Sequence, residues 1–150
     1  MIALDEVEIE GGAGTVNIDS LETQGLYLEV GAGAVKIENV KVSKELKIDG
    51  GAGKTELEHT EVNNLDADLG VGEFTYNGLL TGNTDIDSGV GNIKMDLTDD
   101  IKNYTIDIDK GLGNVTLDGK NIETNRVHGT GKNKIKIDGG VGNIDIDLKK

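Results

Sequence analysis

The chain contains no cysteine, no proline and no tryptophan, and its aromatic residues are one Phe and three Tyr. The absence of cysteine excludes disulfides, thiolate-bound metals and a cysteine nucleophile. No apolar run approaches the roughly 20 residues that a membrane-spanning helix needs. Hydrophobic residues make up 35% of the chain. They are mostly Val, Ile and Leu at alternate positions, which is typical of β-strands.

Positive charge is also scarce. The chain has 15 Lys and Arg against 28 Asp and Glu, which gives a formal net charge of −13 over 150 residues. Such a surface repels nucleic acids and anionic membranes, so neither is expected as a partner. The first residues lack the basic region and apolar core of a signal peptide and begin inside a strand pattern. We therefore expect residues 1–150 to be one domain of a longer protein, whose localisation the sequence leaves open.

Glycine, by contrast, is abundant and regularly placed. Seven Gly-x-Gly triplets that are followed by alternating apolar residues start at Gly12, Gly31, Gly51, Gly70, Gly89, Gly111 and Gly140. Their first glycines lie 19, 20, 19, 19, 22 and 29 residues apart. A nearly constant period of about 20 residues predicts a short unit stacked on copies of itself, which is a solenoid.

Apolar side chains keep fixed positions relative to each triplet. With the first glycine as position zero, they recur at −5, −3, +1, +4 and +6, and polar residues stand between them. This period of two predicts one strand before and one strand after each triplet, with the glycines turning the chain between them. We expect all five columns in the core, with Thr55, Ala67 and Thr84 as their weakest members. The +1 column, expected to point inward, consists of Ala13, Ala32, Ala52, Val71, Val90, Leu112 and Val141.

These patterns predict a single all-β domain that forms a single-stranded right-handed β-helix of about seven rungs. The rungs have 19–22 residues, and the last full rung is lengthened by an insertion. The right hand follows from the rule for parallel crossovers. Among the aromatic side chains, Phe74 and Tyr76 fall in core columns, whereas Tyr27 and Tyr104 are expected to face outward.

The two ends of the rod are expected to be unpaired strand edges. The strand around Val7 and Ile9 should form one end, and the strand over residues 144–148 should form the other. Lys149 and Lys150 would discourage stacking at that end, as edge charges do. End-to-end self-association through the unpaired edges is one expected interaction.

The largest insertion, residues 119–133, is expected to bulge from the rod. Loops of this kind are common contact points of repeat proteins, although a loop without any partner is an equally good interpretation. The candidate contact residues are Lys120, Asn121, Glu123, Asn125, Arg126 and His128.

The repeated triplet, followed by alternating apolar residues and preceded two positions earlier by an acidic one, resembles the bacterial toastrack family. These adhesin-like domains are single-stranded right-handed β-helices. The resemblance covers essentially the whole chain, including the return of the pattern over residues 135–146. It implies a non-enzymatic, envelope-associated domain, in some relatives linked to envelope-stress signalling, and it supplies no catalytic residues or cofactor.

Position −2 is acidic in every repeat, and stacking would place these carboxylates about 4.8 Å apart. At that distance two carboxylates repel by about 1 kcal/mol in water. One interpretation is a ladder of Ca²⁺ sites, with oxygen ligands from Asp49, Asp68, Asp87, Asp109 and Asp138. The other, which we favour, is a solvated row screened by salt, without a bound metal.

No arrangement of residues predicts catalysis. His59 and His128 are the only histidines, and neither belongs to a recognisable metal-binding or Ser/His/Asp pattern. We therefore predict a non-catalytic structural or interaction module without a cofactor. The alternative is a β-helical carbohydrate-binding or polysaccharide-degrading protein that uses paired carboxylates.

Overall fold

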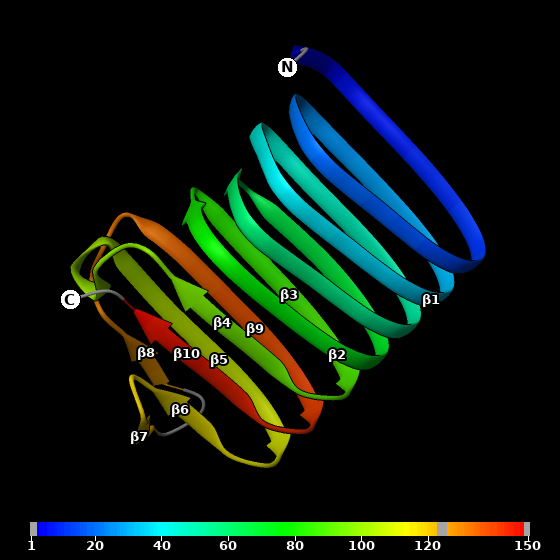
Figure 1. Ribbon diagram of the computed structural model, residues 1–150. Coiled ribbons are helices and arrows are strands. Elements are labelled where there is room, and N and C mark those ends of the chain that lie inside the picture. The colour runs from blue at the N-terminus through cyan, green and yellow to red at the C-terminus, as the bar shows by residue number, and fades with distance from the viewer. Residues whose placement is uncertain (1–2, 123–125, 149–150) are drawn as a thin grey trace.

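The computed structural model describes residues 3–122 and 126–148, and these residues form one strongly coiled sheet (Figure 1). In chain order the elements are β1 (Ala3–Asn63), β2 (Leu65–Thr81), β3 (Asn83–Val90), β4 (Ile93–Leu97), the 3-10 turn η1 (Ile101–Asn103), β5 (Tyr104–Leu112), β6 (Val115–Leu117), β7 (Lys120–Asn121), β8 (Arg126–His128), β9 (Asn133–Val141) and β10 (Ile144–Leu148). Among the described residues the only helical element is η1. The prediction of an all-β domain is confirmed.

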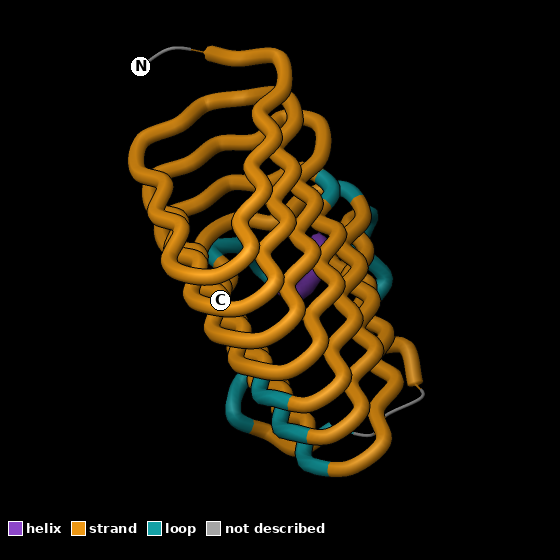
Figure 2. Tube along the Cα trace, turned by 90° about the vertical axis from the view of Figure 1, so that its right-hand side faces the viewer, coloured by secondary structure: helices purple, strands orange, loops and turns teal. Residues whose placement is uncertain are grey.

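Equivalent positions of successive repeats lie side by side. We number the repeats 1 to 7 by their glycine triplets. Repeats 1–3 lie in β1, repeat 4 in β2, repeat 5 in β3 and β4, repeat 6 in β5 and β6, and repeat 7 in β9 and β10. The parallel register of β1 with β2 pairs Ile48 with Ala67 and Leu57 with Tyr76. Figure 2 shows the resulting coil, in which turn lies against turn.

The order of the repeats in space differs from their order in the chain. β9 pairs in parallel with both β3 and β5, and β10 pairs in parallel with both β4 and β6. Repeat 7 therefore lies between repeats 5 and 6 (Figure 1). An asparagine ladder marks this order, because Asn143 N donates to Asn92 Oδ1 at 2.9 Å and Asn114 N donates to Asn143 Oδ1 at 3.0 Å.

The prediction that residues 144–148 form a terminal rung is thus wrong. The longer connection over residues 98–103 lets the chain pass over one level of the coil, about 4.8 Å, before β5 begins. Side-chain bonds fix this connection, since Asn103 Nδ2 donates to Asp99 Oδ1 at 2.7 Å. Repeat 7 then fills the level that was left open. Lys149 and Lys150 lie outside the described residues.

The edge of the coiled sheet next to repeat 6 is partly covered by the insertion itself. β8 pairs antiparallel with β5, and β7 pairs antiparallel with β6. Ile122 packs against the core, and its backbone N donates to the carbonyl of Val115 at 2.9 Å. The expectation that residues 119–133 bulge from the rod is wrong for these strands. They lie along the edge of the last sheet level, where unpaired backbone groups would otherwise be exposed.

Four of the five predicted apolar columns form the core. At −5, −3, +4 and +6, the side chains of repeats 2–5 and 7 are buried, including the weak members Thr55, Ala67 and Thr84. The +1 column is exposed instead, with Val71 at 56% and Leu112 at 69%. The prediction for that column is wrong for a steric reason. The glycines on both sides direct their Cβ positions along the axis, toward the neighbouring repeat. The middle residue of the turn consequently points away from the core.

Tyr104 is buried, although its position suggested an outward side chain. Its hydroxyl donates to the carbonyl of Leu80 at 2.8 Å, while the Tyr76 hydroxyl lies 2.6 Å from the Leu79 carbonyl. Both rings therefore satisfy their one polar atom inside the core. Tyr27 is half-buried on the outer face.

We expect alkaline pH to destabilise the domain through Tyr104. Burial, together with the charge of Asp99, raises the pKa of Tyr104 to about 12 from the ordinary value of 10.0. Its stabilising contribution is therefore complete below pH 10 and is lost as the pH rises toward 12. In Tyr104→Phe, this loss should be absent, and the free energy of unfolding at pH 7 should fall by about 1 kcal/mol with the hydrogen bond. Urea titrations at pH 7 and above pH 10 would show whether the free energies of unfolding of wild type and Tyr104→Phe become more similar as the pH rises.

Candidate functional site: an acidic row beside an apolar ridge

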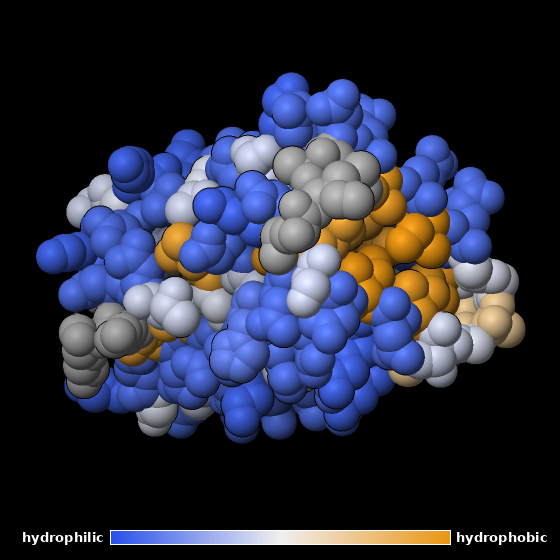
Figure 3. Space-filling model, turned by 45° about the horizontal axis from the view of Figure 1, so that its top comes forward, coloured by the Kyte–Doolittle hydropathy of each residue, from blue (hydrophilic) through white to orange (hydrophobic). Residues whose placement is uncertain are grey.

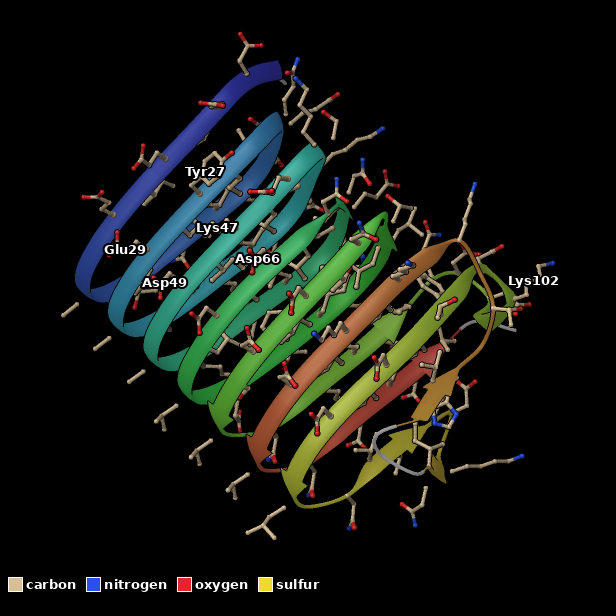
Figure 4. The ribbon with its side chains drawn as sticks, turned by 180° about the vertical axis from the view of Figure 1, so that it is seen from behind. Tyr27, Glu29, Lys47, Asp49, Asp66 and Lys102 are labelled. Atoms are coloured by element: carbon tan, nitrogen blue, oxygen red, sulfur yellow. The ribbon has the colours of Figure 1, made fainter. Side chains whose placement is uncertain are left out.

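The acidic side chains at position −2 lie next to one another on the outer face. The strand registers pair Asp49 with Asp68, Asp68 with Asp87, Asp87 with Asp138, and Asp138 with Asp109. We call these five residues the acidic row. All members of the proposed cation ladder are thereby brought together, in an order that sets Asp138 before Asp109. Glu29 continues the row toward the start of the chain (Figure 4).

The row is poorly neutralised. The ion pairs found among the described residues, Lys36–Glu38, Lys41–Glu61 and Lys54–Glu56, all lie outside it. The neighbouring column at position −4 includes the positive charge of Lys47, which lies opposite Asp66 on the next strand (Figure 4). Partial desolvation, followed by the charges of Asp85, Asp138 and Asp68, raises the pKa of Asp87 above its ordinary value. Like charges on both neighbouring strands thus act on the middle of the row.

Asp87→Asn is expected to stabilise the domain at neutral pH. Because the pKa of Asp87 is raised on folding, the folded state favours the protonated carboxyl. That contribution is present at acidic pH and is lost as the pH rises through the folded pKa. The melting temperature of Asp87→Asn should therefore exceed that of the wild type at pH 7, and the difference should shrink toward pH 3. Asp96→Asn, an exposed change outside the row, provides the control. An equal gain in both variants at pH 7 would contradict a specific effect of the row.

An apolar ridge runs parallel to the acidic row. The exposed +1 side chains Val71, Val90, Val141 and Leu112 lie in register on adjacent strands, and we call these four residues the apolar ridge. They are 56%, 47%, 47% and 69% exposed. Figure 4 shows a line of short, carbon-only side chains projecting from the turns on this side of the coil. Earlier repeats have alanine at the same position, so the ridge is confined to repeats 4–7.

A shallow groove runs along the acidic row. Its walls include Asp68, Asp87, Asp138 and Asp109, and its floor is formed by Leu69, Ser88 and glycines such as Gly89. The floor is low because the first glycine of each triplet in repeats 4–7 stacks directly on a neighbouring backbone. The groove is therefore lined by carboxylates and glycines, and the apolar ridge follows these glycines directly in the chain. Such a surface suits a ligand that combines positive charge with apolar groups.

The model of the Toastrack DUF4097 family matches residues 1–147 of this chain. The chain belongs to the toastrack family. No curated protein and no solved structure matches it. In the described part of this toastrack domain, no helix is long and apolar enough to cross a membrane.

The predicted contact loop is only partly visible in the toastrack domain. Lys120 and Asn121 are exposed in β7, and His128 lies half-buried in β8. Glu123 and Asn125 lie outside the described residues, and for Arg126 only the backbone is described. A contact role for this segment stays a prediction, now attached to a strand pair that also covers the sheet edge.

The sequence interpretation missed the ridge of this toastrack domain, and one signal could have revealed it. A residue flanked on both sides by glycines that turn the chain has no partner layer to face.

No group of three or more His, Cys, Asp or Glu among the described residues is arranged to hold a metal. The choice between a Ca²⁺ ladder and a screened row therefore stays a prediction. We expect no Ca²⁺-specific rise in melting temperature at matched ionic strength.

Proposed function

We propose that this domain is a non-catalytic, adhesin-like interaction module of a bacterial cell-envelope-associated protein that takes part in envelope-stress signalling. In this proposal the coiled sheet is a right-handed β-helix of seven rungs that serves as a stiff rod. Family membership supports the architecture, since a solenoid presents an extended surface to a partner.

The observation that carries the proposal is the apolar ridge. Val71, Val90, Val141 and Leu112 form a line over four adjacent sheet levels, and each is about half exposed or more. Contiguous exposed aliphatic side chains are uncommon on soluble proteins unless they form an interface. The adjacent acidic row specifies the charge of the partner. We propose that the groove binds a protein segment in which Lys or Arg side chains accompany apolar ones.

The test compares three proteins in site-specific cross-linking to the envelope fraction of the source bacterium. Wild type is compared with Val90→Ser/Val141→Ser, which removes the middle of the ridge. The matched control is Ala13→Ser/Ala32→Ser, which changes the same column outside the ridge. Circular dichroism melting verifies that all three are folded. We expect one cross-linked partner shared by wild type and control, weakened at high salt and lost from the ridge variant. An identical partner set in all three proteins would refute the groove as the binding surface.

A second candidate function is carbohydrate binding, which one observation favours. Tyr27 lies on the outer face in a surface groove with Glu8, Glu29, Lys47 and Asp49 (Figure 4). A tyrosine ring among polar groups can pack against a sugar while hydrogen bonds fix its orientation. A glycan array probed with wild type and Tyr27→Ala would decide this. Binding that depends on Tyr27, or hydrolysis of a glycan, would replace the protein-interaction proposal.

A further inference from the structure

Among the described residues, no strand covers the end of the coiled sheet that repeat 1 forms. Its core side chains Val7, Ile9, Val16 and Ile18 are only partly buried. The side chains at the same positions in repeat 2, such as Leu28 at 2% and Ile37 at 0%, are almost completely covered. Apolar surface gathers at this end of the molecule in Figure 3. At the opposite end, β7 and β8 pair with parts of β6 and β5, whereas no described strand pairs with the outer edge of repeat 1.

The glycine turn of repeat 1 has room for the backbone of a further strand, which the described residues do not supply. A Cβ at Gly31 would lie 2.7 Å from the Gly12 carbonyl oxygen, and a Cβ at Gly111 would lie 2.6 Å from that of Gly140. These glycines are required because a neighbouring repeat lies directly over them. A Cβ at Gly12 would meet nothing within 4 Å, and Gly12 is not among the glycines with positive φ. The turn of repeat 1 therefore has no side chain at Gly12 that would prevent a further strand from stacking on it.

The charge of this end identifies the kind of strand that would fit. Residues 1–35 contain seven Asp and Glu and no Lys, Arg or His. In the first strand, the exposed Glu6, Glu8 and Glu10 alternate with the inward-facing Val7 and Ile9. A second copy would bring the same glutamates against their equivalents, and like charges directly opposite each other destabilise a strand pair. A strand with basic residues at these positions would be attracted instead.

We propose that repeat 1 accepts an extended segment of a partner protein that alternates apolar and basic side chains. The segment adds one level to the coiled sheet, in the manner of β-strand addition. Its apolar side chains cover Val7, Ile9, Val16 and Ile18, and its Lys or Arg side chains lie beside Glu6, Glu8 and Glu10. Main-chain hydrogen bonds to the open edge supply affinity, and the glutamates supply the selection for charge. This end site is separate from the groove of the proposed function.

The experiment uses a synthetic peptide that copies residues 6–18 but carries lysine at positions 6, 8, 10, 15 and 17. The control peptide carries glutamate at those five positions. Fluorescence anisotropy measures binding to the whole domain, and backbone amide NMR shifts locate it. We expect the lysine peptide to bind at least tenfold more tightly than the glutamate peptide. The affected amides should lie within residues 5–21, and the affinity should fall as salt is added.

Two protein variants complete the test. Glu8→Lys should weaken binding of the lysine peptide, whereas Glu73→Lys, the same charge reversal on an exposed residue of repeat 4, should leave it unchanged. Equal binding of both peptides, no binding of the lysine peptide, or shifts confined to the groove around Val90 would each overturn the proposal. So would a wild-type dimer in light scattering that Ile9→Lys dissociates, because the occupant would then be a second copy. Shifts at residues 5–21 would support the end site whatever the outcome for the ridge.

Discussion

Truncation of the chain after Lys132 is expected to destroy the native structure of repeat 6, and not merely to remove the last two strands. β9 and β10 are the parallel neighbours of β3, β4, β5 and β6. Without repeat 7, repeat 6 has no level to stack on, and Ile106 and Ile108 lose the neighbours that cover them. Hydrogen exchange should show that amides of residues 104–117 have lost their protection, while amides of residues 26–62 remain protected.

A pair of point variants tests the same arrangement without removing chain. Ile137 and Ile9 both occupy position −3, but Ile137 lies between two repeats and is 0% exposed, whereas Ile9 is half-buried at the open end. Ile137→Ala should lower the free energy of unfolding by about 4 kcal/mol, and Ile9→Ala by about 1 kcal/mol. Equal losses in urea titrations, or a truncated chain whose residues 104–117 keep native protection, would contradict the position of repeat 7.

Gly72→Ala is expected to lower the free energy of unfolding by about 4 kcal/mol, the sum of a conformational and a packing cost. The φ of Gly72 is +139°, a conformation that costs a residue with a Cβ about 1–3 kcal/mol. In addition, the new Cβ would lie closer than 3.0 Å to the Gly53 carbonyl, where only a shift of the backbone could relieve the overlap. Overlap of this kind in a packed interior costs about 1–3 kcal/mol or more. Thermal and urea unfolding would measure the loss.

Gly14→Ala separates the two causes. Gly14 has a similar φ of +119°, but its Cβ would meet nothing within 4 Å because no repeat lies over it. Only the conformational cost should remain, so this variant should lose about 1 kcal/mol. The difference between the variants isolates the contribution of stacking. Closely similar losses at both positions would show that the turn conformation alone requires glycine, and that the close approach of the repeats does not.

The stacking and the core followed from the sequence because they depend on nearest neighbours. A period of about 20 residues aligns like positions, so the spacing of apolar residues alone assigns the columns at −5, −3, +4 and +6 to the core. The +1 column could not be assigned by the same rule. Alternation in and out holds within a strand, whereas Val71 and Val90 stand at turns, where the backbone changes direction and the period of two is interrupted.

The acidic row was predicted as a set but not in its order. Strand pairing is a long-range property, and residues 98–103 and 119–133 are long enough to pass over a level in either direction. One local feature agreed with the observed order. Asn92, Asn143 and Asn114 share position +3 and bond to one another in the order of repeats 5, 7 and 6. Identical polar residues at one position of non-consecutive repeats can therefore indicate which repeats are neighbours.

The placement of repeat 7 between repeats 5 and 6 has a consequence for how the chain folds. Most solenoids can grow by adding each repeat to the one before it. Here the contacts between repeat 5 and repeat 7 join residues that lie far apart in the sequence, such as Asn92 and Asn143, which are 51 residues apart. Such closures are slow, and during synthesis they leave the edges of repeats 5 and 6 exposed. The C-terminal part of the domain can reach its native state only after β10 has emerged from the ribosome.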